Sequence, residues 1–376
     1  MKHYGADDRT SQFFKSFFTD RSLYTEWKGV SSEPVKMYNH SCVQGSCLGP
    51  PAYNFYTQDL KNATNCEVVC FADDTNLIMS DKDPNNLIRN MNKELNKTHN
   101  YMTQNTLIIN ESKTYFLLFK PKGSKKQEIS EKLLINHKEI MRVNSARYLG
   151  IWFDEDLKFK KQYEILINKL EETVKALIAV RTLLNYKIKL LIYHSLFQSH
   201  INYCSIAYLD KLTPGQIDTI YKLQKKAIRL IFKARINAHT SQLFKLAKII
   251  PFNKLYDTEA IKFVFINISN TSKDKQPKAI QNILFKNEEL KKATRLQEDE
   301  SKVKIFHKYR RGHAIYNILN SWNKTEVKHR MAGNILSLKN LLKESTLKEL
   351  ESCVRPNCMI CELDSNRNYE SYMMKL

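Results

Sequence analysis

The sequence predicts an α+β fold in the first part of the chain, followed by an all-helical and basic second part. Short apolar runs stand on both sides of Asp73 and Asp74, which is typical of a β-hairpin. After about residue 160, apolar residues recur at helical spacing instead. The net charge of +21 is also uneven, because Lys and Arg balance Asp and Glu in residues 1–120 and residues 121–376 carry the whole excess.

The first elements follow from aromatic and Gly/Pro positions. Residues 10–20 place four phenylalanines on one face and predict an amphipathic helix. Residues 34–43 are compatible with a strand. Gly and Pro over residues 45–51 then predict a turn before the apolar run that starts at Tyr53.

A hairpin and a long helix are the strongest local patterns. Apolar segments at 66–72 and 75–80 predict two strands joined by a two-residue turn made of Asp73 and Asp74. Pro84 opens a helix over 84–104, because proline is favoured in the first helical turn. Further strands are expected in chain order at 107–109, at 115–119 and at a segment ending with 147–153.

The second part reads as a series of helices. Thr213 and Pro214 form an N-cap and first helical position. Residues 271–303 are lysine-rich and polar, and we expect them to be partly disordered. The predicted helices are 160–184, 187–209, 213–233, 240–248, 253–268 and 306–322.

Composition excludes several classes of protein. The sequence contains no run of about 18 apolar residues, so it predicts no membrane span. The N-terminus lacks the apolar core of a signal peptide, so we expect an intracellular protein, in nucleus or cytoplasm, whose cysteines are reduced. The basic excess favours contact with nucleic acid over a merely solvated lysine surface. From the residues alone, two interpretations of the Asp pair remain, a turn that holds a metal ion and an ordinary solvated turn.

Two segments carry a resemblance to a known family. "VQGSCLGPPAYNFYTQDL", followed by "FADDTNLIMS", resembles the central palm motifs of non-LTR retrotransposon reverse transcriptases of the jockey type. "RYLG" at 147–150 resembles the primer-grip segment, and "YHSLFQSHINYCSIAY" and "LQKKAIRLIF" resemble the downstream helical region. The resemblance implies a partial polymerase palm, an antiparallel sheet with helices, over 1–158 and a basic helical thumb-like region over 159–270. A lysine-rich linker (271–303) and a C-terminal helical region (304–376) would follow.

The resemblance also implies roles for individual residues. Asp73 would hold a catalytic Mg²⁺ or Mn²⁺, with Asp74 as its supporting carboxylate. Lys113 would lie near the triphosphate of a dNTP, where an ammonium offsets developing charge. The nucleotide and template side would be lined by Gln44, Gly45, Ser46, Phe71 and Ala72. The primer end would be supported by Tyr148, Leu149 and Gly150.

One expected segment of the family does not occur in the sequence. The family's palm carries an earlier aspartate in a segment of the form apolar-D-x-x-x-A-F-D, and no such segment is present. Asp7 and Asp8 stand at the head of a predicted helix, where capping is favoured over metal binding. We therefore expect a truncated remnant with little or no polymerase activity alone, acting on an RNA template, DNA primer or hybrid. The alternatives are a non-enzymatic basic nucleic-acid-binding protein and a product with no specific partner.

The tail contains a second candidate metal motif. Cys353, Cys358 and Cys361 have the spacing C-x₄-C-x₂-C. A structural zinc site requires four ligands, and the nearest histidine, His329, lies far upstream. Free thiols are thus favoured over Zn²⁺ at this position.

Overall fold

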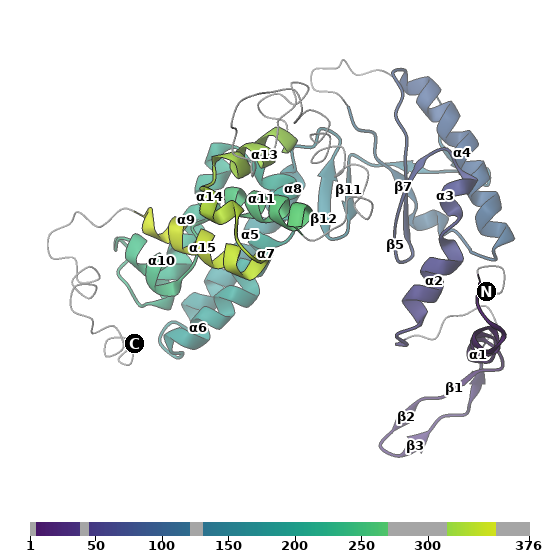
Figure 1. The fold of residues 1–376 in the computed structure, drawn as a ribbon, viewed down its shortest axis with the longest axis horizontal. Coiled ribbons are helices and arrows are strands. Elements are labelled where there is room, and N and C mark those ends of the chain that lie inside the picture. The colour runs from purple at the N-terminus through teal and green to yellow at the C-terminus, as the bar shows by residue number, and fades with distance from the viewer. Residues whose placement is uncertain (1–4, 38–44, 121–130, 270–313, 351–376) are drawn as a thin grey trace. The chain divides into compact units, whose positions relative to one another are not determined.

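A computed structural model describes residues 5–37, 45–120, 131–269 and 314–350 of the chain (Figure 1). It divides into two compact units, Met1–Asn144 and Ser145–Leu376. Within the described residues, no helix combines the length and the apolar character that a membrane crossing requires.

The first unit begins with helix α1 (Asp8–Phe18), where the sequence predicted a helix over 10–20. The side chain of Asp7 accepts a hydrogen bond of 2.7 Å from the backbone N–H of Thr10, which confirms Asp7 as the N-cap. Hydrogen bonding by Thr10, first from its side chain and then from its backbone N–H, lowers the pKa of the Asp7 carboxyl. The rings of Phe13 and Phe17 stack along one side of the helix, as the spacing of four residues requires.

Two short antiparallel pairs follow α1. Strand β1 (Ser22–Leu23) pairs with β4 (Val35–Lys36), and β2 (Glu26–Trp27) pairs with β3 (Val30–Ser31). Of the strand expected at 34–43, the described part is therefore only β4, and residues 38–43 lie outside the described ranges.

Helix α2 (Gly49–Thr57) begins where the sequence predicted a turn. Pro50 and Pro51 lie in its first turn, where the missing N–H groups cost no intrahelical hydrogen bond. The two prolines therefore start a helix instead of a loop, and the apolar residues from Tyr53 onward continue it. A short helix, α3 (Leu60–Ala63), leads to the hairpin.

The predicted hairpin and the predicted long helix are both confirmed. Strands β5 (Glu67–Phe71) and β6 (Asp74–Ile78) are antiparallel, and α4 spans Pro84–Gln104. Asp83 caps α4 by accepting hydrogen bonds from the N–H groups of Asn85 and Asn86. Buried side chains of α4 pack with those of the later strands to form the core of this unit: Ile88, Leu95, Leu133, Ile135 and Ile140.

The strand expected at 107–109 does not form. Ile108 is 97% exposed, and the side chain of Asn110 accepts the N–H of Lys113, which turns the chain into a short 3₁₀ helix, η2 (Glu111–Lys113). The next strand is limited to β7 (Tyr115–Phe116), which pairs in parallel with β10 (Met141–Arg142).

The last pair of the first unit is β8 (Leu134–Ile135) with β9 (Lys138–Glu139). All sheets in the described part of the chain are two-stranded. The α+β class is therefore confirmed as helices with small strand pairs, and these pairs do not join into one larger sheet.

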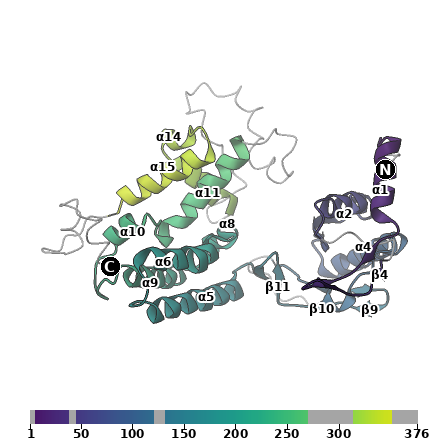
Figure 2. The ribbon, with the colours of Figure 1, turned by 90° about the horizontal axis from the view of Figure 1, so that it is seen from below.

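The second unit opens with an antiparallel hairpin of β11 (Ser145–Tyr148) and β12 (Ile151–Asp154). The compact unit that starts at Ser145 includes this hairpin. Helices make up the rest of its described part (Figures 1 and 2): α5 (Lys160–Ala179), α6 (Tyr186–Ile192), η3 (Tyr193–Gln198), α7 (Ser199–Asn202), α8 (Ser205–Tyr208), η4 (Leu209–Lys211), α9 (Pro214–Ile231), α10 (Ser241–Ala247), α11 (Phe252–Ser269), α13 (Ala314–Lys324), α14 (Val327–Arg330) and α15 (Ile335–Lys348).

The single helix expected at 187–209 is divided into several pieces. A π-helical segment, η3, interrupts its α-helical hydrogen bonding, and Cys204 adopts a left-handed φ of 48° before α8. By contrast, α9 begins as predicted, because Thr213 and Gln216 form a reciprocal capping box.

The core of the second unit surrounds η3 and α9. Leu177, Tyr193, Phe197 and Ile228 have no exposed surface. Gln224 is also fully buried, and its amide bonds the Tyr193 hydroxyl, the carbonyl of Ile250 and the N–H of Phe252. A second cluster joins three later helices, α11, α13 and α15, through Val264, Leu319 and Leu338.

Candidate functional site

The tip of the β5–β6 hairpin is the candidate catalytic turn. The strand ladder closes with Phe71 opposite Asp74, so the two loop residues are Ala72 and Asp73. The expectation that Asp73 and Asp74 form the turn together is therefore wrong by one residue, because pairing continues to Asp74 as the first residue of β6. Ala72 has a φ of 50°, a left-handed conformation that costs a non-glycine residue roughly 1–2 kcal/mol.

Helix α2 lies beside this turn through Tyr53. Burial raises the pKa of the Tyr53 phenol, and the negative charges of Asp73 and then Cys70 raise it further. An electrostatic effect of this kind requires the two side chains to be near each other.

The two carboxylates at the turn are exposed and available. Across the described residues, neither the Asp73 nor the Asp74 side chain forms a hydrogen bond or an ion pair, and no three His, Cys, Asp or Glu side chains are grouped as metal ligands. Carboxylate oxygens are the ligands that Mg²⁺ prefers, and protein sites for it often supply only one or two carboxylates alongside water and phosphate. The donor chemistry of the pair therefore fits a hard divalent cation.

Of the other residues predicted to line the nucleotide side, some belong to the turn and others precede helix α2. Phe71 and Ala72 belong to it, and Phe71 is 60% exposed. Gly45 has a φ of 77°, and the hydroxyl of Ser46 accepts the N–H of Leu48 at 3.1 Å just before α2. These two residues thus stand at the start of the helix that carries Tyr53.

Lys113 has no described contact with the turn, and the remaining candidates lie outside the described chain. No ion pair in the described part of the chain joins Lys113, at the end of η2, to either aspartate. Gln44 and the tail cysteines Cys353, Cys358 and Cys361 lie outside the described residues.

The predicted primer-grip residues form a second tight turn, in the second unit. Tyr148 pairs with Ile151, so Leu149 and Gly150 are the loop residues, and their φ angles are 45° and 84°. Positive φ at both loop positions is the geometry of a type I′ hairpin turn. The hydroxyl of Tyr203 donates to the carbonyl of Leu149 at 2.6 Å and holds this turn against the helical region.

Sequence reasoning did not identify Glu94, which supports the base of the β5–β6 hairpin. This carboxylate is 6% exposed and accepts hydrogen bonds from the Thr64 hydroxyl, the Asn65 N–H, the Asn65 amide and Lys97. The Lys97 bond, followed by the Asn65 N–H, lowers the pKa of Glu94 to about 2. The sequence signal that could have identified Glu94 is its position, a charged residue on the inner face of the predicted helix.

Comparison with known protein families gives a match over the first part of the chain. Residues 8–153 match the family model described as reverse transcriptase (RNA-dependent DNA polymerase). The matched segment is less than half of the 376-residue chain, and it includes both tight turns. No curated protein and no solved structure gives a significant match.

Proposed function

We propose that this chain carries the palm of a non-LTR, jockey-type reverse transcriptase and binds nucleic acid, with little or no polymerase activity alone. The observation that carries the proposal is the Asp73 turn, which lies within the segment that matches the reverse transcriptase family. Two motifs support it further, since "VQGSCLGP" and "FADD" occur in the order expected for a palm.

In this proposal, Asp73 is the residue that holds a divalent cation, Mg²⁺ or Mn²⁺, and Asp74 supports it. When bound, such a cation neutralises the charge of the transferring and leaving phosphates. Tyr53 and the backbone around Gly45 and Ser46 would border the nucleotide, as would Gln44, Phe71 and Ala72. Lys113, at the end of η2, would lie near the triphosphate of a bound dNTP.

We expect weak polymerase activity because of the number of metal ligands. Members of the family use a further aspartate from an earlier strand, and the sequence has no segment of that form. A site with fewer carboxylates holds its cation less firmly and places the primer hydroxyl less well. Asp7 does not replace the missing group, because its carboxylate caps α1.

The remaining parts of the chain have roles in the same proposal. Residues 159–270 act as a basic thumb-like region, 271–303 as a linker and 304–376 as a C-terminal helical region. Tyr148, Leu149 and Gly150 support the primer end. The partners are an RNA template with a DNA primer, or their hybrid, so we expect the protein to act in the nucleus or cytoplasm.

The test is primer extension on an RNA template with Mg²⁺ and with Mn²⁺, comparing the full chain with its Asp73→Asn variant. Binding of Mn²⁺ in the presence of a dNTP is measured in parallel by electron paramagnetic resonance. We expect no extension by either protein, and weaker Mn²⁺ binding by the variant. Extension by the unmodified chain that Asp73→Asn abolishes would overturn the claim of weak activity.

The same measurement separates the second candidate function, a purely nucleic-acid-binding protein with an unused Asp pair. The excess positive charge of residues 121–376 favours this candidate. It predicts salt-sensitive RNA binding together with Mn²⁺ binding that Asp73→Asn leaves unchanged. A chain that binds neither RNA nor Mn²⁺ contradicts both candidates.

A further inference from the structure

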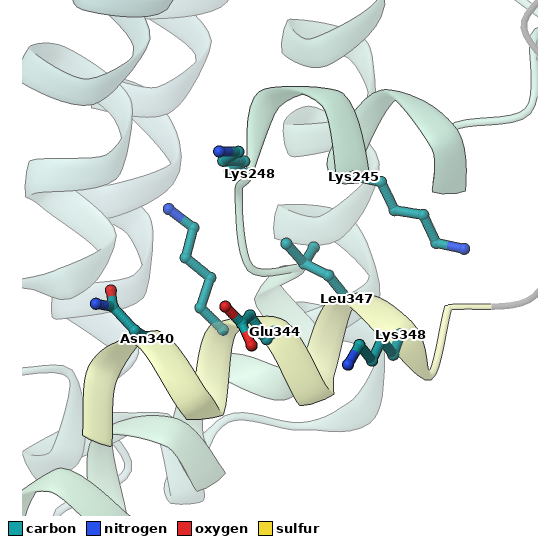
Figure 3. Close-up of a pocket in the computed structure, with 7 residues that line it drawn as sticks. Lys245, Lys248, Asn340, Glu344, Leu347 and Lys348 are labelled. Carbon is teal, nitrogen blue, oxygen red and sulfur yellow. The ribbon is translucent and has the colours of Figure 1, made fainter. Parts of the chain in front are cut away.

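A basic pocket lies between α10 and α15 in the second unit (Figure 3). Its volume is about 640 Å³, within the range of sites that hold small organic groups. On α15, Figure 3 shows Asn340 toward one end of the pocket and Lys348 toward the other, with Lys248 opposite them at the end of α10. The lining residues are Lys245, Lys248, Asn340, Lys343, Glu344, Leu347 and Lys348.

Positive charge in this pocket exceeds negative charge. Four lysines line it and Glu344 is its one carboxylate. Within the described residues, no ion pair joins any of the four lysines to a carboxylate, although other lysines of this unit do form such pairs. The pocket therefore presents more ammonium groups than its one carboxylate can compensate.

Two of the lysines that line the pocket, Lys343 within α15 and Lys248 directly after α10, act on each other electrostatically. Burial lowers the pKa of Lys343, and the positive charge of Lys248 lowers it further. Lys343 also acts on His194, whose pKa is lowered first by burial and then by this ammonium. Lys343 and Lys248 come from different helices, so the fold itself brings these like charges together at a cost that a bound anion would offset.

Helix dipoles explain only part of this arrangement. Lys245 and Lys348 lie in the last turns of α10 and α15, where cations complement the negative end of a helix. Lys343 lies before the last turn of α15, so the helix dipole gives no reason for its place in the pocket lining.

We propose that this pocket binds phosphate groups of a nucleic-acid backbone, with Lys248 and Lys343 as the principal contacts. The partner is a nucleic-acid strand because its phosphates repeat along a chain and match lysines spread along an open pocket. The lining contains no aromatic side chain on which a base could stack. Contact with phosphate alone carries no sequence information, so binding here is independent of base sequence. The inference rests on the proposed function, which supplies the nucleic acid.

The test measures RNA affinity of the full chain by fluorescence anisotropy. The probes are labelled oligouridine and oligoadenine of about 20 nucleotides, at salt concentrations from about 50 to about 200 mM. The pocket variant is Lys248→Gln with Lys343→Gln. The control variant, Lys158→Gln with Lys254→Gln, removes the same charge from lysines paired with Asp156 at 2.7 Å and with Glu349 at 3.1 Å.

Two lost phosphate contacts on a single strand should reduce the slope of log affinity against log salt by about 1.4. We expect this reduction for the pocket variant, equal for both RNAs, and a clearly smaller change for the control. Thermal melting followed by circular dichroism verifies that both variants fold.

Each other outcome has a defined meaning. RNA binding by the unmodified chain with equal slopes in the pocket and control variants overturns the pocket assignment and leaves the proposed function standing. Loss of binding to inorganic phosphate without a change in RNA binding also overturns it. No saturable RNA binding by the unmodified chain overturns the inference together with nucleic-acid binding as the function. In the same assay, the Asp73→Asn variant is expected to show the same slope of log affinity against log salt as the unmodified chain.

Discussion

The phenolic hydroxyl of Tyr203 donates a hydrogen bond of 2.6 Å to the backbone carbonyl of Leu149, 54 residues earlier in the chain. Leu149 and Gly150 form the turn of the β11–β12 hairpin, and both have positive φ. A Cβ atom added at Gly150 would lie 3.3 Å from the Tyr203 ring. The tyrosine therefore covers this turn, and glycine is required there for both conformation and space.

Gly150→Ala is expected to destabilise the second unit by about 1–2 kcal/mol, because alanine is strained at positive φ and crowds the Tyr203 ring. Tyr203→Phe removes only the hydrogen bond and should cost about 1 kcal/mol. Urea unfolding followed by tryptophan fluorescence measures both changes.

Gly215→Ala is the matched control for this pair. Gly215 lies in α9, and no atom lies within 4 Å of a Cβ added there. The substitution should leave stability unchanged or raise it by less than about 1 kcal/mol. Equal losses from Gly150→Ala and Gly215→Ala would contradict the role assigned to the turn.

Asp73→Asn is expected to lower the pKa of Tyr53. The negative charge of Asp73 contributes to the raised pKa, so removing that charge brings the value back toward normal while burial keeps it from returning fully. The measurement is a pH titration by nuclear magnetic resonance with ¹³C-labelled tyrosine. Asp74→Asn should have a smaller effect, and an equal effect from both variants would refute the placement of Asp73 toward α2.

Glu94 should make the stability of the first unit sensitive to acid. Its pKa is about 2 in the folded protein and 4.5 ordinarily, so its stabilising contribution is complete above pH 4.5 and is lost as the pH falls toward 2. Glu94→Gln should cost about 2 kcal/mol at neutral pH and weaken the dependence on pH in this window. Unfolding by urea at several pH values tests this.

Glu139→Gln provides the comparison for Glu94. Glu139 pairs with Lys132, but both side chains are more than half exposed, and such pairs contribute about 0–1 kcal/mol. Acid sensitivity that survives Glu94→Gln in full would show that another group is responsible.

Gln224→Leu is expected to destabilise the second unit by about 2–4 kcal/mol. The substitution keeps the volume but leaves the Tyr193 hydroxyl and the Phe252 N–H without their partner in a fully buried site. Thermal or urea unfolding measures the loss. Lys226→Ala, at an exposed position of the same helix, should change stability by no more than about 0.5 kcal/mol.

Elements with strong local signals were predictable. Both ends of α4 agree with the sequence, because Asp83 caps it and Pro84 occupies its first position. The same is true of the start of α9 at its capping box. The predicted helix at 187–209 was wrong as a single element, since helical periodicity does not reveal a π-helical segment or the left-handed residue Cys204.

The sequence by itself determined the α+β class, the β5–β6 hairpin and the motif pattern that contains Asp73, because local propensity and periodicity encode these features. Only the tertiary structure decided which residues occupy the turn. The register of β5 against β6 depends on how the two strands pair, and residue propensity does not specify that pairing. It also decided that the charge of Asp73 acts on Tyr53, that Tyr203 covers Leu149 and that Lys248 and Lys343 line one pocket. Such contacts join segments that are separated in sequence, and packing of the whole unit brings them together.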